Sequence, residues 1–425
     1  MMEKYKVRII DSLIERKLKG KGALLIEGPK WCGKTTTAEQ FSKSILYMTK
    51  GEDVQSNLMM ADINPSKLLE GETPHLIDEW QVAPKLWDAV RFEVDHRDNF
   101  GHFILTGSAV PPKTDNIFHT GTGRFAWIKM RPMSLYESLE SSGEVSLKEL
   151  FNQPFQLNGE NKIDLDKLAF LICRGGWPEA VDKNKDVALN QAMDYYTEIV
   201  NSNISIVDDV QRNPERAKRL MKSYARNQGS HISYAGIRDD IKAHDSESIS
   251  EDTIYSYTNA LRKIFVIEDM PAWNPKLLSK TAIRTSDTRY FIDPSIATAS
   301  LGLGPEDLKN DLITMGLLFE TMCVRDLRVY AESIDGEVFH YRDKSGLECD
   351  TVIHLRNGSY GFVEIKLGGD KLIEEGAVSL KKFSAKIDTN KMKAPSFLMI
   401  LTGTGKYAYR RDDGVYVVPI GCLKN

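Results

Sequence analysis

The chain has 425 residues, which is enough for two to four domains. Hydrophobic residues make up 41 % of the chain and charged residues 27 %, a balance typical of a globular protein with a large core. The formal net charge of −4 excludes a basic field over the whole chain that would attract nucleic acid.

The five cysteines are scattered without a CxxC pair, which favours reduced thiols in a cytoplasmic protein over a disulfide framework. The segment 1–22 is charged throughout and lacks the apolar core of a signal sequence. No apolar run reaches the length of about 18 residues that a transmembrane helix needs. We therefore expect a cytoplasmic protein with no membrane partner.

Short apolar runs alternate with helical segments in the first third of the chain. Residues 6–18 carry apolar side chains at helical spacing, and the runs 23–26, 75–77 and 102–105 are typical of short buried strands. This alternation predicts an α/β fold with a parallel sheet sandwiched by helices. A polar stretch, 138–148, is expected to end the sheet domain.

A phosphate-binding loop follows the first of these strands. Residues 28–35 read Gly-Pro-Lys-Trp-Cys-Gly-Lys-Thr and match the pattern GxxxxGK[ST] in full, between a strand and a helix. In such a loop, backbone N–H groups surround phosphate oxygens, the lysine reaches the β- and γ-phosphates, and the threonine ligates Mg²⁺. The predicted nucleotide-binding residues are Gly28, Pro29, Gly33, Lys34, Thr35 and Thr36.

The second apolar strand ends in Asp78-Glu79, the arrangement of a Walker B motif. We expect Asp78 to hold Mg²⁺ through bound water and Glu79 to orient or deprotonate the attacking water. An Asp-Glu pair also ends many solvated strands, but the P-loop upstream favours the functional interpretation.

Two further segments can contribute to this site. Thr106 and Ser108 follow the third strand, where either hydroxyl could contact the γ-phosphate or the attacking water, or simply belong to an ordinary strand exit. Arg124 precedes another strand-like run, and an arginine there can offset transition-state charge, in cis or from a neighbouring subunit.

These motifs support a family resemblance. The P-loop, LIDEWQ at 76–81, ILTGSA at 104–109 and the stretch from Gly123 to Glu137 resemble AAA-type ATPases, and most of all a group of predicted bacterial and archaeal ATPases with a conserved C-terminal half. Residues 174–179, RGGWPE, resemble the GGxPE motif of that group at the start of a helical lid. The resemblance implies that Thr106 or Ser108 is the first sensor, Arg124 the arginine finger and Arg174 a second sensor.

The middle of the chain is expected to be helical. Helical segments from about 165 to 209 form the lid, and a basic helix opening at Asn213-Pro214, two shorter helices and an extended run at 265–268 resemble a winged helix. Segment 205–270 has a net charge of −1, and the would-be recognition helix begins with Glu251 and Asp252. This charge favours a structural or protein-binding role over DNA reading.

The C-terminal part is again α/β in pattern. Segments 338–343, 348–355 and 360–367 are expected to be consecutive strands, followed by a helix and a further strand. Asp350, Glu364 and Lys366 on these strands resemble the PD-(D/E)xK nucleases, and Glu320 matches the upstream helical acid of that superfamily. Carboxylates would hold Mg²⁺, and the lysine would position or activate water. The competing interpretation is a surface hairpin with an exposed Glu/Lys pair.

The turn before the third strand decides between these interpretations. A two-residue Asn-Gly turn pairs Thr351 with Glu364 and puts Asp350 on the wrong face. A three-residue loop with Gly358 in a left-handed G1 bulge puts Asp350 opposite Glu364. The nuclease interpretation requires the second geometry.

The sequence thus predicts an ATPase core at 1–150, a helical lid at 151–209, a winged-helix-like domain at 210–275 and a nuclease-like domain at 276–425. The expected ligands are ATP and Mg²⁺. One hypothesis is an ATPase whose nucleotide cycle controls a nuclease acting on DNA or RNA. The other is an ATP-driven conformational switch whose C-terminal domain only binds nucleic acid or protein. The sequence leaves assembly into a homo-oligomer open.

Overall fold

The computed structural model describes residues 5–110, 121–152, 157–208, 210–245, 249–274 and 286–425, which form two compact units. Unit 1 comprises Met1–Pro132, Glu198–Asn213 and Ser256–Val266. Unit 2 comprises Met133–Thr197, Pro214–Tyr255 and Ile267–Asn425. None of the described helices has the length and apolar character that a bilayer crossing requires. The four predicted domain ranges stay predictions.

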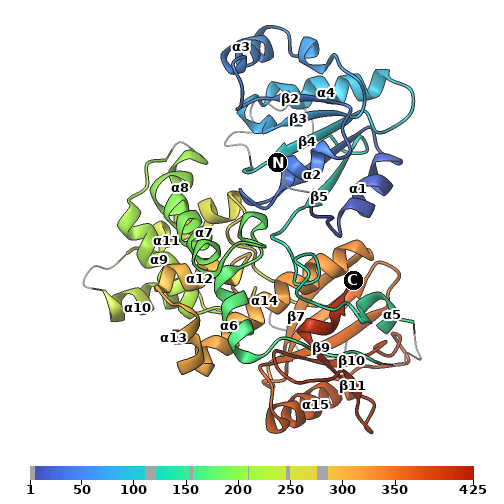
Figure 1. Cartoon of the computed structure of the whole chain (residues 1–425), viewed down its shortest axis with the longest axis vertical. Helices are drawn as coiled ribbons and strands as arrows, with labels where there is room; N and C mark the ends of the chain where they lie inside the picture. Colours follow the sequence, from blue (N-terminus) through green and yellow to red (C-terminus); the bar gives the residue numbers. More distant parts are fainter. Residues whose placement is uncertain (1–4, 111–120, 153–156, 209, 246–248, 275–285) are drawn as a thin grey trace. The chain divides into compact units, whose positions relative to one another are not determined.

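Unit 1 contains a five-stranded sheet whose strand pairs are all parallel, as the sequence predicted (Figure 1). Its strands lie in the order β2 (Ser44–Tyr47), β3 (His75–Asp78), β4 (Phe103–Gly107), β1 (Ala23–Glu27) and β5 (Phe125–Lys129). The helices that pack on it are α1 (Asp11–Leu18), α2 (Lys34–Glu39), α3 (Val54–Ile63) and α4 (Lys85–His96).

Two apolar layers hold these helices on opposite faces of the sheet. Successive strand residues point to opposite faces, so Leu24 packs in one cluster with Ile14 of α1, and Leu25 packs in another with Leu86 of α4. Because both faces are buried, the strands consist almost entirely of apolar residues. The predicted sandwich of helices around a parallel sheet is confirmed.

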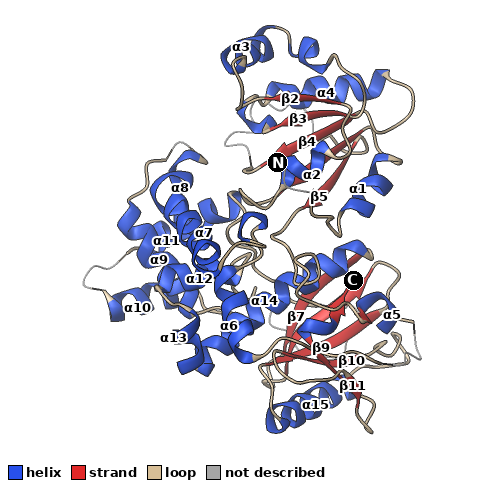
Figure 2. Cartoon of the chain, viewed as in Figure 1, coloured by secondary structure: helices blue, strands red, loops and turns tan. Residues whose placement is uncertain are grey.

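Unit 2 contains a group of helices in addition to its sheet (Figure 2). They are α5 (Leu147–Leu150), α6 (Leu165–Arg174), α9 (Pro214–Arg226), α10 (Tyr234–His244), α12 (Pro294–Leu301), α13 (Pro305–Asn310) and α14 (Leu312–Ser333). Helices α7 (Lys185–Glu198) and α11 (Glu251–Lys263) contain residues of both units, and the short helix α8 (Ile204–Ile206) belongs to unit 1.

The three helices expected before the predicted wing are present, but the wing itself is not confirmed. In its place the described residues form isolated bridges, Ile267 with Phe291 and Met270 with Thr288. Several basic side chains of α9 and α10 pair with acids, for example Arg226 with Asp240 at 2.5 Å. The preference for a structural or protein-binding role of this module over DNA reading stays a prediction.

A six-stranded sheet forms the C-terminal part of unit 2. Its strands lie in the order β11 (Tyr409–Arg410), β12 (Tyr416–Pro419), β10 (Leu398–Thr402), β9 (Tyr360–Lys366), β8 (Glu348–Leu355) and β7 (Gly336–Arg342). Strands β7 to β9 are antiparallel neighbours, whereas β10 is parallel to β9 and β12. Helix α15 (Asp370–Ala385) packs on one face through Leu380 and Phe383.

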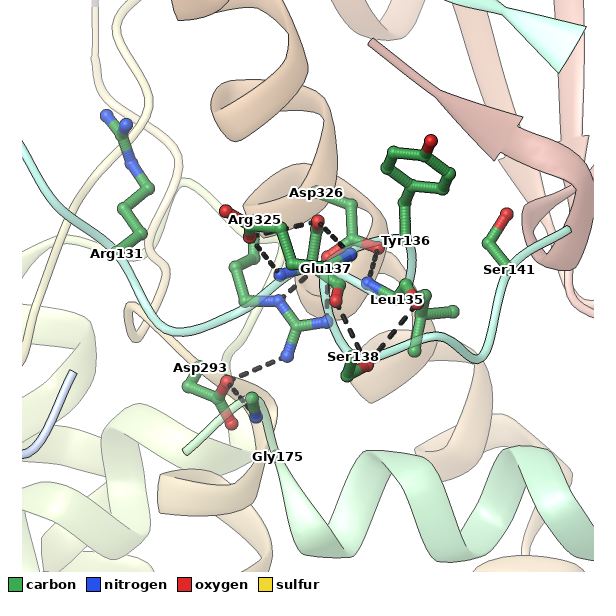
Figure 3. A network of polar contacts seen from close by, with 12 residues as sticks. Arg131, Leu135, Tyr136, Glu137, Ser138, Ser141, Gly175, Asp293, Arg325 and Asp326 are labelled. Carbon is green, nitrogen blue, oxygen red and sulfur yellow. Dashed lines mark hydrogen bonds and ion pairs between the residues drawn. The ribbon is translucent and has the colours of Figure 1, made fainter. Parts of the chain in front are cut away.

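A buried ionic network ties together distant segments of unit 2 (Figure 3). Arg325 on α14 pairs with Asp293 at 2.8 Å and with Asp326 at 2.7 Å, and all three side chains are almost fully buried. The Leu135 N–H donates to Asp326, and the Gly176 N–H donates to Asp293. Because each buried charge has a partner, the network fixes the RGGWPE turn and the segment after Met133 to α14.

Candidate functional site

The loop after β1 has the backbone of a phosphate-binding nest. Trp31, with a φ of 65°, and Gly33, with a φ of 98°, both lie in the left-handed region and are separated by Cys32. Left-handed residues that alternate with right-handed ones turn successive N–H groups toward one concavity, which suits an anion. A Cβ at Gly28 would lie 2.1 Å from the Met130 carbonyl oxygen, so the close approach there requires glycine.

The predicted P-loop lysine is held against this loop. Lys34 is buried, and its Nζ donates to the Pro29 carbonyl oxygen at 2.8 Å. Its charge therefore lies beside the nest. Thr36, in contrast, is exposed in the first turn of α2 and has no role in the contacts described below.

Asp78 joins the P-loop to the sheet. The carboxylate is fully buried, and its Oδ1 accepts hydrogen bonds from Thr35 Oγ1 at 2.6 Å and from Thr106 Oγ1 at 2.7 Å. Asp78 Oδ2 accepts no hydrogen bond among the described residues and lies 3.6 Å from Lys50 Nζ. Oxygen ligands are those that Mg²⁺ prefers, so Thr35 and Asp78 Oδ2 fit this ion.

The backbone conformation of Glu79 orients its side chain, and two polar side chains donate hydrogen bonds to its carboxylate. Its φ of 59° is left-handed, and its N–H donates to Thr106 Oγ1 at 3.1 Å. Its Oε2 accepts hydrogen bonds from Ser108 Oγ at 2.7 Å and from Gln81 Nε2. Thr106 therefore positions the backbone, whereas Ser108 contacts the candidate catalytic carboxylate and is the better placed of the two for a sensor role.

The C-terminal hairpin adopts the bulged geometry that the nuclease interpretation requires. Gly358 has a φ of 82°, and the Leu355 N–H donates to the Ser359 carbonyl oxygen at 2.8 Å. Strands β8 and β9 pair Thr351 with Val363. Continuing the same register puts Asp350 opposite Glu364.

The three predicted polar residues of the hairpin contact one another. Lys366 Nζ lies 3.2 Å from Asp350 Oδ2 and 2.8 Å from Glu364 Oε2, and the Ile365 N–H donates to Asp350 at 2.8 Å. Glu320, whose carboxylate accepts a hydrogen bond from the Tyr290 hydroxyl, is close enough to interact electrostatically with Asp350. No group of three or more His, Cys, Asp or Glu side chains in the described ranges has the arrangement of a ready metal site.

These contacts shift the pKa values of the cluster. Burial and the negative charge of Asp350 raise the pKa of Glu364 to about 8 and that of Glu320 likewise to about 8. Burial lowers the pKa of Lys366, but the charges of Asp350 and Glu364 outweigh it and raise that pKa above its ordinary value. The cluster is thus a set of crowded carboxylates around one ammonium group.

Residues 20–139 match the model of the AAA domain. Together with the nest and the Walker B contacts, this match shows that the N-terminal part of the chain is an AAA-type P-loop domain. Two further models match, both described as domains of unknown function, DUF8612 over residues 165–307 and DUF4143 over residues 315–423. Neither describes a winged helix or a nuclease, so these two assignments stay predictions.

Solved structures provide distant similarities. A Walker-type ATPase of Pyrococcus abyssi is 14 % identical, with a TM-score of 0.42, over 71 % of this chain and 97 % of that protein. A STAND protein with a tetratricopeptide repeat sensor from Pyrococcus horikoshii is 13 % identical, with a TM-score of 0.22. That match covers 62 % of this chain and 53 % of the other. A search of curated proteins found no match.

Arg124 lies at the wrong edge of the AAA sheet for a finger in cis. The Ala23 N–H donates to the Arg124 carbonyl oxygen, so Arg124 lies beside the start of β1, whereas the P-loop follows the end of that strand. The intervening strand spans about 13 Å at a rise of roughly 3.3 Å per residue. Arg124 instead pairs with Asp95 at 2.7 Å and lowers the pKa of that carboxyl. The cis alternative is therefore wrong, and a role in trans stays a prediction.

A mixing experiment tests that role. Arg124→Ala protein retains Lys34, and Lys34→Ala protein retains Arg124, so a shared interface can combine one intact nucleotide site with one intact finger. We expect each variant alone to hydrolyse little ATP and the mixture to recover part of the wild-type rate of phosphate release. Failure to recover, in a mixture shown by crosslinking to co-assemble, would contradict a finger in trans.

Arg174, the predicted second sensor, makes polar contacts within the protein. It is buried in unit 2, where its guanidinium donates to Glu140 Oε1 at 2.6 Å, to Ser138 Oγ at 3.3 Å and to the Gly175 carbonyl oxygen at 3.1 Å. These contacts all lie within unit 2 and give Arg174 a structural role there, whereas the second-sensor role stays a prediction.

Sequence reasoning missed two residues that contact the candidate nucleotide site. Gln81 belongs to the quoted LIDEWQ motif, and its place two residues after Glu79 is a signal that could have been used. Lys50 has no such signal, because it meets Asp78 only through the pairing of β2 with β3.

The raised carboxyl pKa values predict a pH dependence of stability. A folded-state pKa near 8 lies above the unfolded value near 4.5, so Glu364 and Glu320 hold protons that the unfolded chain releases. Their contribution to stability is full below the unfolded pKa and is lost as pH rises through about 8. We expect the melting temperature in EDTA to fall between about pH 4.5 and pH 8. Glu364→Gln should flatten this fall, whereas Glu375→Gln, at an exposed position on α15, should leave it unchanged.

Proposed function

We propose that this AAA domain binds ATP with Mg²⁺ and hydrolyses it. One observation carries the proposal. Thr35 of the P-loop and Thr106 of β4 donate to the same oxygen of the buried Asp78, which joins the phosphate-binding loop to the Walker B strand. A merely solvated strand end would not bury a carboxylate between two hydroxyl donors.

Binding follows from groups that are already in position. The N–H groups of the nest and the ammonium of Lys34 would receive the β- and γ-phosphate oxygens of ATP, at the cost of the Lys34 bond to Pro29. Thr35 and Asp78 would hold Mg²⁺, Asp78 through bound water. That ion would supply positive charge against the phosphates.

Hydrolysis requires a second step at Glu79. A water oxygen forms a bond to the γ-phosphorus, the bond to the bridging oxygen breaks, and ADP leaves. Glu79 accepts a hydrogen bond from that water and can take its proton. Ser108 and Gln81 both donate hydrogen bonds to Oε2 of this carboxylate, so Oε1 would receive the water.

Equilibrium titration tests the binding step. We expect a fluorescent ATP or ADP analogue to bind one site per chain, and EDTA to weaken that binding. Binding that ignores Mg²⁺, or no binding at millimolar nucleotide, would argue against the proposal.

A second candidate function concerns the C-terminal domain. The bulged register, which brings Lys366 to both Asp350 and Glu364, favours a metal-dependent nuclease-like centre that acts on DNA or RNA. The alternative is a domain that binds nucleic acid or protein without cleaving it. Incubation of varied DNA and RNA with Mg²⁺ or Mn²⁺, with and without ATP, distinguishes them. Cleavage that disappears in Lys366→Ala supports the nuclease, and binding without cleavage supports the switch.

A further inference from the structure

Asp78 has an ion-pair partner that the Walker motifs do not include. Both hydroxyl donors reach Asp78 Oδ1, which leaves Oδ2 buried without a hydrogen-bond donor among the described residues. The ammonium of Lys50 lies 3.6 Å from that oxygen. The side chain of Lys50 is 60 % exposed, whereas Asp78 has no exposed area. A solvent-exposed cation therefore lies beside a buried anion.

The pairing of β2 with β3 brings Lys50 close to the Asp78 carboxylate. Strand β2 is parallel to β3 with Tyr47 beside Asp78, so the chain leaves β2 at the edge of the sheet where the Walker B strand ends. The Met48 N–H then donates to the Asp78 carbonyl oxygen at 3.2 Å. Lys50 Nζ lies 5.5 Å from the centre of the Tyr47 ring, and Gly51, with a φ of 92°, turns the chain away. This turn keeps the lysine close to the carboxylate.

Charge explains why a cation belongs there. A buried carboxylate without a counter-charge is costly, and Mg²⁺ can supply that charge only when it is bound. Lys34 is engaged with the P-loop carbonyl of Pro29, and Lys50 is a cation that contacts Asp78. Because Lys50 is exposed on a long flexible stem, it can leave when a divalent ion arrives.

We propose that Lys50 is the counter-ion of Asp78 in the metal-free site and is displaced when Mg²⁺ enters with the nucleotide. This inference rests on the proposed ATP site. It makes Lys50 a positioning residue that opposes Mg²⁺ binding, since two like charges compete for one carboxylate. The metal-free protein is then stabilised by Lys50, and the loaded protein is not.

Three variants test the inference in the full-length protein. Lys50→Met removes the charge and keeps the stem, Lys50→Arg keeps the charge, and Lys43→Met removes an exposed lysine just before β2, at the other end of that strand. The readouts are the melting temperature without metal or nucleotide and the Mg²⁺ concentration that half-saturates binding of a fluorescent ADP analogue.

We expect Lys50→Met to lower the metal-free melting temperature by about 2 °C and to tighten the Mg²⁺ half-saturation by up to about fivefold. Lys50→Arg and Lys43→Met should behave like the wild type. An unchanged Mg²⁺ titration in Lys50→Met overturns the inference. Lys50→Met protein that binds ATP more weakly but ADP as tightly as the wild type also overturns it, because Lys50 would then be a γ-phosphate ligand. If the wild-type protein binds no nucleotide, it is the proposed ATP site that fails.

Discussion

Lys34→Ala should abolish measurable ATP hydrolysis. The substitution removes the cation that lies against the nest and would offset charge on the β- and γ-phosphates. Loss of one preorganised electrostatic contact costs about 10² to 10³ in kcat. A fluorescent nucleotide titration beside a phosphate-release assay measures both steps, and we expect binding and turnover to fall together.

The matched control for this variant lies in the same loop. Lys30 points to the end of α7 and the turn after it, where its Nζ lies 3.3 Å from Glu198 Oε1 and 2.9 Å from Asn203 Oδ1. Lys30→Ala therefore removes the same charge from the loop without touching the bond to Pro29, and should retain most nucleotide binding. Equal losses of nucleotide binding in both variants would mean that the total positive charge of the loop, rather than the specific position of Lys34, binds the phosphates.

Glu79→Gln should leave ATP bound and stall its hydrolysis. The amide preserves the shape of the side chain but cannot take a proton from water, and general base catalysis contributes about 10² to 10⁴ in rate. We expect nucleotide affinity close to the wild-type value and single-turnover hydrolysis slower by at least about 10².

Glu72→Gln, at an exposed position before β3, is the control for the charge change. It should turn over ATP at the wild-type rate. If Glu79→Gln instead loses binding, with no specific defect in the chemical step, Glu79 supports the fold of the site rather than the reaction.

The local parts of the nucleotide site could be predicted from the sequence. The P-loop is contiguous, and its strand–loop–helix context determines where Lys34 and Thr35 lie relative to the nest. Asp78 and Glu79 follow a buried strand, and in a parallel sheet the carboxyl ends of neighbouring strands lie at one edge. In the structure, Thr106 and Ser108 at the end of β4 contact Asp78 and Glu79 at that edge. A contact of either hydroxyl with the γ-phosphate or the attacking water stays a prediction.

The parts that could not be predicted depend on distant contacts. Arg124 precedes its strand, so it lies at the amino edge of the same sheet, and Asp95 at the end of α4 meets it there. Arg174 forms an ion pair with Glu140 inside unit 2, and nothing in the RGGWPE motif indicates that partner. Lys50 reaches Asp78 by strand pairing alone.

The hairpin shows how far local geometry can carry a prediction. Turn chemistry alone left two registers, and only the three-residue loop with a G1 bulge at Gly358 puts Asp350 and Glu364 on one face. The structure adopts that register. What turn chemistry could not predict is the burial that raises the pKa of Glu364, because it comes from the packing of α15, where Ser379 also contacts that carboxylate.

The central claim is that the AAA domain hydrolyses ATP at the P-loop. The most direct measurement is the rate of phosphate release from ATP by the wild-type protein, with Mg²⁺ and with EDTA, beside Lys34→Ala prepared in the same way. We predict release that requires Mg²⁺ and is lost in Lys34→Ala. Release at the wild-type rate by Lys34→Ala, or no release by a wild-type protein that has bound ATP and Mg²⁺, would contradict the claim.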